Sequence, residues 1–255
     1  VIHPDDIDLY RDAAEGLGPL AWLGAAVLAA VVLVAIFAPW IAPYSLDYVD
    51  VTRQLEPPSP AHPLGTDENG ADLLTQVIYG TRVAVMVGFS VVGICATVGI
   101  FVGAISGYFG GWIDEVIMRL IDMLMAFPGI LLAILLIFIT QEPSIPAVIG
   151  ALSVTGWTSY ARLVRGEVLS EREEDYVEAA RSLGFRVPRI LFREILPNVM
   201  APVIVQGTFG MAAAILAEAS LSFLGLGPQN VPSWGALLDQ GASYFLLTPH
   251  LAIFP

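Results

Sequence analysis

Five long stretches of the chain carry no charged residue, and their spacing predicts the architecture. Each stretch lies between two charged residues and holds between 19 and 31 residues. The stretches are 16–46, 83–113, 123–141, 143–161 and 195–217. A helix of about 20 mainly apolar residues crosses roughly 30 Å of hydrocarbon and pairs its own backbone groups, so each stretch can form one membrane span. A sixth uncharged stretch starts after Asp239 and is still running at Pro255, so we expect a sixth span that the sequence truncates.

Proline and glycine residues divide these stretches into helices and connections, because both residues tend to end helices. The predicted helices are 19–38, 83–106, one that starts near 112, one that follows the 143–146 turn and ends near 161, and 199–217. Residues 44–79 form a polar, proline-rich loop, and 221–247 form a polar or re-entrant stretch. The sequence therefore predicts an all-α, polytopic membrane protein with six transmembrane helices.

Arginine residues give the orientation of these spans. Seven of the 11 arginines fall in the connection between the fourth and fifth predicted helices. Positively charged loops remain in the cytoplasm. Counting back through the spans places the amino terminus inside, the 44–79 loop outside, and the turn at Gly107 inside.

Composition supports a membrane protein and excludes several functions. Of 255 residues, 56% are hydrophobic and only 14% are charged, with a mean hydropathy of +0.74, whereas soluble domains carry about 25% charged residues. The net charge of −13 argues against a nucleic-acid partner. The chain has no lysine for a phosphate-binding loop, and its three histidines are too scattered for a metal site. Cys95 lies in an apolar run and is expected to pack there.

The connection at 167–197 is far more charged than a simple loop requires. Tyr176, Ala179, Ala180 and Leu183 follow the i, i+3, i+4, i+7 spacing of one helix face. Gly184 suits the position just past a helix end, and a proline at 188 suits the first turn of a second helix. The segment predicts a cytoplasmic helix–turn–helix with a small alanine face onto which another protein could dock. The alternative is an amphipathic connector that lies on the membrane.

The same segment resembles the EAA loop of binding-protein-dependent ABC importer permeases. The resemblance rests on Glu178-Ala179-Ala180, then Gly184 after three residues, and Leu196-Pro197 further on. One departure is Glu194, where the family usually has isoleucine two places before the leucine. Other stretches are similar to the dipeptide, oligopeptide and nickel permease subfamily, namely 62–67, 70–73, 79–82, 122 with 126–128, 218–227 and 232–235. Within them Ala71 departs from the arginine that relatives often carry.

The resemblance implies the fold, the partners and the roles of individual residues. It implies a type I ABC importer permease in the prokaryotic cell membrane, with 1–18 as a cytoplasmic N-terminal segment, 19–82 as the first transmembrane helix and external loop, and 83–255 as the permease domain that contains the 167–197 coupling loop. It implies a second homologous permease, two cytoplasmic ATPases that bind ATP and magnesium in place of this chain, and an extracytoplasmic solute-binding protein. The solute would be a dipeptide, an oligopeptide, a nickel complex or another small solute. The residues implied to contact the ATPase are Tyr176, Glu178, Ala179, Ala180, Leu183, Gly184 and Pro197.

Polar residues within the predicted spans are candidates for the translocation path, because charge inside a membrane is costly. Asp122 and Glu218 are the two strongest, and the alternative for each is a hydrogen bond between helices or a place near the interface. Hydroxyl residues in the fourth helix, at 153, 155 and 158–160, would either line a hydrated path or bond to their own helix backbone. A membrane-embedded enzyme is one alternative function, but the predicted spans contain neither a nucleophile and base nor a metal cluster for it. An ion-driven secondary transporter is the other alternative. It would more typically show an internal repeat and broken helices with paired ionisable residues.

Overall fold

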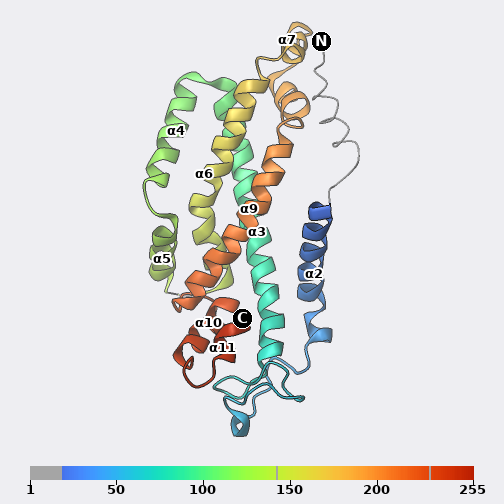
Figure 1. Ribbon diagram of the computed structural model, residues 1–255. Helices are drawn as coiled ribbons and strands as arrows, with labels where there is room; N and C mark the ends of the chain where they lie inside the picture. Colours follow the sequence, from blue (N-terminus) through green and yellow to red (C-terminus); the bar gives the residue numbers. More distant parts are fainter. Residues whose placement is uncertain (1–18, 142, 230) are drawn as a thin grey trace.

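The computed structural model describes residues 19–141, 143–229 and 231–255, and the described chain is built from helices (Figure 1). The expected cytoplasmic segment at 1–18 lies outside the described residues. The longer helices are α2 (Pro19–Ile41), α3 (Leu73–Phe109), α4 (Gly111–Met125), α5 (Gly129–Thr140), α6 (Ile145–Glu171), α7 (Asp175–Ser182), α9 (Met200–Phe223) and α10 (Trp234–Ser243). The short elements are a 3₁₀ turn η1 (Val51–Arg53), α8 (Val187–Arg189), a π-helical turn η2 (Ile190–Ile195) and α11 (His250–Ile253).

Three of these helices, α2, α3 and α9, are long and apolar enough to cross a membrane. The pair α4 and α5 meets the same test when taken together, although the two helices meet at a bend of 80°. Pro128 stands at the start of α5 and has no backbone N–H to continue the α4 hydrogen-bond ladder, which explains the break. The prediction of an all-α protein with membrane spans is confirmed.

The centre of the fold is the pair α3 and α6, which pack along their length. Three glycines spaced one turn apart on α3, at 99, 103 and 107, let the two backbones approach closely. A Cβ atom on Gly103 would lie 2.4 Å from the carbonyl oxygen of Ala161, which is not physically allowed. Val87, Val148 and Val164 are fully buried around this contact. Gly99 and Gly103 therefore serve the close packing of α3 on α6.

Two helices extend beyond their predicted bounds, for identifiable reasons. Helix α3 begins at Leu73 rather than near Val83, because Asp72 caps it and accepts a hydrogen bond of 2.8 Å from the Thr75 N–H. Helix α6 continues to Glu171 instead of ending near 161. Its first two arginines, Arg162 and Arg165, are paired with carboxylates of α4, so they belong to the helix and not to the loop.

The last part of the chain differs from the predicted polar stretch and sixth span. Helix α9 runs on to Phe223, and α10 packs against α9 and α11. The residues after Asp239 form the end of α10 and the short α11, and not one continuous helix. The sixth span therefore stays a prediction.

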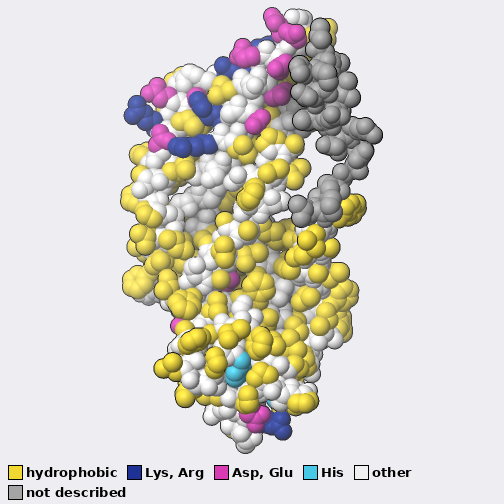
Figure 2. Space-filling view, in the orientation of Figure 1, with side chains coloured by type: hydrophobic (Ala, Val, Ile, Leu, Met, Phe, Trp, Pro, Cys, Tyr) yellow, Lys and Arg dark blue, Asp and Glu magenta, His cyan; other side chains and the backbone are white. Residues whose placement is uncertain are grey.

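On the face shown in Figure 2, charged side chains are concentrated at one end of the molecule, around α7 and the start of α4, and apolar side chains cover the middle. This distribution agrees with helices that lie in a bilayer and a charged end that lies in water. The opposite end holds the loop between α2 and α3 together with α10 and α11. The arginine distribution predicts that the charged end is cytoplasmic and the opposite end external, and the two ends are named accordingly below.

Candidate functional site

The predicted helix–turn–helix of the coupling loop is present at the charged end. Helix α7 spans Asp175–Ser182 and ends in a Schellman motif: the N–H of Phe185 bonds to the Ala180 carbonyl at 3.1 Å, and the N–H of Gly184 bonds to the Arg181 carbonyl at 2.9 Å. Gly184 has φ +77°, a left-handed conformation that glycine adopts without strain. The predicted turn at Gly184 is confirmed.

The predicted docking face of α7 is divided between the interior and the solvent. Val177 and Ala180 are buried in the subunit's own core, at 0% and 6% exposure. Glu178, Ala179 and Leu183 are exposed, Leu183 at 73%. Of the two alanines, only Ala179 is therefore open to another protein. Val177 was not among the predicted site residues, although its spacing of three from Ala180 was visible in the sequence.

Tyr176 connects α7 to the residues on either side of it. Its hydroxyl donates to the Glu171 carboxylate and accepts from the Asn198 side-chain amide at 3.1 Å. Asn198 also donates to the Glu194 carbonyl at 3.1 Å. Partial burial and the hydrogen bond to Glu171 raise the pKa of Tyr176. Tyr176 thus fixes α7 to the end of α6 and to the turn that contains the exposed Pro197.

Two arginine–carboxylate pairs join α4 to α6. Asp114 binds Arg165 through two hydrogen bonds and also accepts one from Ser106 of α3. Asp122 pairs with Arg162, and both side chains are about half exposed. The structure therefore gives Asp122 a partner between helices, which is the alternative considered for this residue.

Glu218 occupies a different environment from Asp122. It is 1% exposed, lies on α9, and accepts a hydrogen bond of 2.7 Å from Ser222. Within the described residues, no ion pair or hydrogen bond joins Glu218 to Asp122 or to an arginine. The two candidate path residues are not brought together.

Three stretches that are similar to the permease subfamily and lie far apart in the sequence, 79–82, 218–227 and 232–235, meet at the external end. The indole N–H of Trp234 donates to the Val77 carbonyl at 3.1 Å, and a Cβ on Gly80 would lie 2.8 Å from the Trp234 ring. A Cβ on Gly235 would lie 1.9 Å from the Ala219 carbonyl oxygen. The start of α10 is therefore held tightly against α3 and α9.

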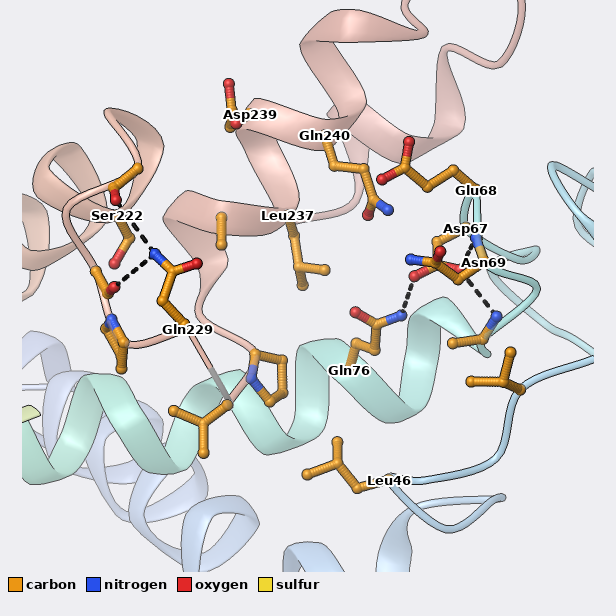
Figure 3. Close-up of a pocket in the computed structure, with 18 of the residues that line it drawn as sticks. Leu46, Asp67, Glu68, Asn69, Gln76, Ser222, Gln229, Leu237, Asp239 and Gln240 are labelled. Carbon is orange, nitrogen blue, oxygen red and sulfur yellow. Dashed lines mark hydrogen bonds between the residues drawn. The ribbon is translucent and has the colours of Figure 1, made fainter. Parts of the chain in front are cut away.

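Beside this contact lies a cavity of about 610 Å³, between the loop before α3, the end of α9 and α10 (Figure 3). Four carboxylates line the cavity, those of Asp47, Asp67, Glu68 and Asp239. Among the described residues, no basic side chain lines it. Asp67 is satisfied locally by the Gln76 side chain at 2.6 Å and by two backbone N–H groups. This cavity was not predicted from the sequence, because its walls come from three separate segments.

A second cavity, of about 280 Å³, lies among α3, α5, α6 and α9. Thr155, Ser159 and Tyr160 line it, and a hydrated path along them stays a prediction. The Thr158 hydroxyl instead bonds to the Thr155 carbonyl of its own helix at 2.6 Å. The Ser153 hydroxyl is buried without a hydrogen-bond partner among the described residues and does not line the cavity, so Ser153 takes neither role.

The fold and the charged helix–turn–helix at its cytoplasmic end define a polytopic transport permease. Residues 99–253 match the family model described as binding-protein-dependent transport system inner membrane component. Residues 19–58 match the model of the N-terminal TM domain of oligopeptide transport permease C. The chain belongs to the family of binding-protein-dependent transport system inner membrane components, so its predicted place in the inner membrane is confirmed.

Individual relatives cover nearly the whole chain. It is 40% identical over 249 residues to the dipeptide transport system permease protein DppC of Alkalihalophilus pseudofirmus, an alignment that covers 96% of this chain and 82% of the relative. It is 35% identical over 257 residues to the oligopeptide transport system permease protein OppC of Bacillus subtilis, with 100% and 84% covered. It is 40% identical over 226 residues to the glutathione transport system permease protein GsiD of Pectobacterium atrosepticum, with 88% and 75% covered.

Proposed function

We propose that the chain is a permease subunit of an ATP-driven importer for dipeptides, oligopeptides or similar small peptides. It pairs with a second homologous permease, two cytoplasmic ATPase subunits bind and hydrolyse ATP with magnesium, and an external solute-binding protein delivers the peptide. Relatives named for dipeptide, oligopeptide and glutathione transport support the substrate class.

The observation that carries the proposal is the exposed face of α7. Glu178, Ala179 and Leu183 form a small, water-facing surface at the charged end, on a helix whose other face is anchored in the subunit core. The small side chain of Ala179 lets a partner surface approach the helix backbone, and Leu183 supplies an apolar contact. Val177 and Ala180 transmit a push on this surface to the bundle because they are buried.

Cysteine cross-linking in the assembled transporter tests this docking. Ala179→Cys is expected to cross-link to a cysteine in the partner ATPase, whereas Ala180→Cys is expected to cross-link poorly because its side chain points into the core. Cys95 is the only natural cysteine of the chain and is buried, so Cys95→Ala gives a clean background. Equal cross-linking at both positions, or none at 179 in an assembled complex, would count against the docking face.

Vesicle uptake tests the energy source. Vesicles with the complete transporter, the binding protein and internal ATP are expected to accumulate a labelled dipeptide, dialanine, or a labelled oligopeptide. Vesicles that contain this chain alone with an ion gradient are expected to show no uptake. Uptake under the second condition would instead support a secondary transporter.

A further inference from the structure

Two neighbouring faces of α9 differ in the middle of the bundle. Val205, Phe209 and Leu216 form a face of large apolar side chains, each more than half exposed, which suits contact with lipid. The face beside it carries one amide and otherwise only small residues. It follows the spacing of one helix face and lines the cavity of about 280 Å³ described above, with Gln206, Gly210, Ala213, Ala214 and Ala217. The small residues leave the volume open, and Gln206 is the polar residue of this face.

The wall that α6 contributes to the cavity is also polar. Thr155 and Ser159 lie one turn apart near the middle of α6. Tyr160, beside them, is buried and donates its hydroxyl to the Gln206 carbonyl oxygen at 3.4 Å. Gly210 is required here, because a Cβ atom at this position would overlap the Tyr160 hydroxyl. The Tyr160 contact uses the backbone of Gln206, so it does not occupy the Gln206 side-chain amide.

Three of the polar side chains that line the cavity have unused hydrogen-bonding groups. Within the described residues, the side chains of Thr155, Ser159 and Gln206 form no hydrogen bond. Val91 lines the cavity at the midpoint of α3, a helix long enough to cross a membrane, so the cavity lies at the depth of the hydrocarbon. Lipid chains offer no hydrogen-bond partner, and unpaired polar groups in hydrocarbon are costly. An occupant that supplies donors and acceptors is therefore favoured over a lipid chain.

The chemistry of the lining matches a peptide group. The Gln206 amide offers a carbonyl acceptor and an N–H donor, the same pair as a peptide bond, and the two hydroxyls can donate or accept. Among the described residues, no charged side chain lines this cavity, whereas four carboxylates line the external one. The volume of about 280 Å³ is close to the lower end of the roughly 300–1,000 Å³ typical of small-molecule sites, so the cavity admits a short peptide segment.

We propose that this cavity is a solute site at which Gln206, Thr155 and Ser159 hydrogen-bond the backbone of a passing peptide without any ionic contact. The proposal rests on the proposed function, since it takes a peptide as the solute. A neutral site recognises the groups that all peptides share, whatever the charge of their side chains. It also releases them readily, whereas a fixed charge would hold peptides of opposite sign and repel those of like sign.

Two substitutions of opposite sign at Gln206 test the site. Vesicles contain the complete transporter with internal ATP, and uptake of labelled alanyl-lysine and alanyl-aspartate is measured at saturating peptide-loaded binding protein. Gln206→Glu should raise the ratio of cationic to anionic uptake about 10-fold, and Gln206→Lys should lower it by a similar factor, since like charges repel strongly out of water. Gln206→Asn keeps the amide and should leave the ratio within about 2-fold of the unaltered chain. Poor folding of a variant lowers both rates alike and cancels in the ratio.

Thiol labelling separates the cavity from the lipid face of α9. A charged, water-soluble methanethiosulfonate reaches thiols in water but not those in lipid. Gln206→Cys is expected to react, and Val205→Cys, the adjacent position on the apolar face, is the matched control that should not. The unaltered chain, whose single cysteine is the buried Cys95, gives the background. No reaction at Gln206→Cys, or equal reaction at both positions, would contradict a solute site on this face.

Failure of the site and failure of the proposed function give different results. If the unaltered transporter accumulates peptide with ATP but the Glu and Lys substitutions leave the ratio unchanged, the site is wrong and the proposed function stands. Labelling of Gln206→Cys together with an unchanged ratio would show a cavity that holds water only, and it would equally overturn the site. If the unaltered transporter accumulates neither these two peptides nor dialanine, the proposed function itself is contradicted.

Discussion

The two ends of the helical bundle are stabilised by different kinds of polar contact. At the external end, His62 and Asp72 are buried at about 1% and 0% side-chain exposure, with 2.9 Å between Nδ1 and Oδ1. At the cytoplasmic end, Arg162 and Asp122 pair across 40 residues of sequence with 44% and 62% of their side chains exposed. The His62–Asp72 contact is local and dry, whereas the Arg162–Asp122 pair joins distant elements and remains partly in water.

This difference sets how easily each end can rearrange. Buried hydrogen bonds to a charged group contribute about 1.5–3 kcal/mol, and removing one partner leaves the other unsatisfied. Exposed ion pairs contribute only about 0–1 kcal/mol and exchange readily with water. Breaking the His62–Asp72 contact is therefore expected to cost more than breaking the Arg162–Asp122 pair, which can exchange its partner for water at small cost.

The largest effect is expected at the external end, from Asp72→Ala. The change removes the cap of α3 at Thr75 and leaves His62 buried without its partner, at a combined cost of about 3 kcal/mol. For a chain of this size the melting temperature should fall by roughly 6–12 °C. Thermal unfolding of the detergent-purified protein measures the change. Asp72→Asn keeps an oxygen for the cap and should lose clearly less, and equal losses would contradict the role of the cap.

Arg165→Met should have an intermediate effect at the cytoplasmic end. The change removes both hydrogen bonds from Arg165 to the Asp114 carboxylate, whose side chain is 17% exposed. The free energy of unfolding should fall by about 2 kcal/mol. The control is Arg119→Met on α4, since the Arg119–Glu115 pair is about 70% exposed on both sides and should contribute less than about 0.5 kcal/mol. Equal losses of melting temperature in the two variants would contradict the expected difference in stability between the partly buried and the exposed ion pair.

The sequence was sufficient to predict three of the spans and the coupling helix, because both depend on local patterns. Uncharged stretches located α2, α3 and α9, and the position of Gly184 located the end of α7. The orientation of α7 was predicted less well. A helix of eight residues has too few turns to distinguish the face of Tyr176 and Ala179 from the neighbouring face of Val177 and Ala180.

Contacts between distant segments could not be predicted in the same way. The partner of Asp122 is decided by how α4 lies against α6, and nothing in the local sequence around either residue specifies it. The external cavity depends on the packing of three segments, which is set by close contacts such as that of Gly235 with Ala219. The cap at Asp72 does have a local signal, an N-cap residue three positions before Thr75, whereas the predicted helix begins only at residue 83.

Substitutions of Glu218, near the external end of α9, should have smaller effects on stability and test whether this residue binds solute. Glu218→Gln keeps an oxygen that can accept the Ser222 hydrogen bond, so stability should change by less than about 0.5 kcal/mol and peptide uptake by less than about 2-fold. Glu218→Ala leaves the Ser222 hydroxyl unsatisfied and should lower stability by about 1–3 kcal/mol. If Glu218 instead binds the ammonium group of a peptide, uptake by Glu218→Gln would fall about 10-fold while stability stayed unchanged.

His250 should make the external end sensitive to acid. Burial lowers the pKa of His250, and the nearby Glu56 carbonyl only partly offsets this. The folded state therefore binds this proton less tightly than the unfolded state, and stability should decline as the pH falls below about 6.5. Melting temperatures between pH 7.5 and 5.5 measure the decline, and His250→Gln should make it shallower. An unchanged slope would exclude His250 as its source.

Tyr176 should give the cytoplasmic end the opposite and smallest response. Because its pKa is raised, the folded state holds the phenol proton more tightly than the unfolded state. Its contribution to stability is present below about pH 10 and is lost as the pH rises further. Tyr176→Phe, which has no titrating group, should show a shallower fall in melting temperature between pH 9 and 11. If His250→Gln alters only the acid side and Tyr176→Phe only the alkaline side, each residue accounts for the pH response of its own end.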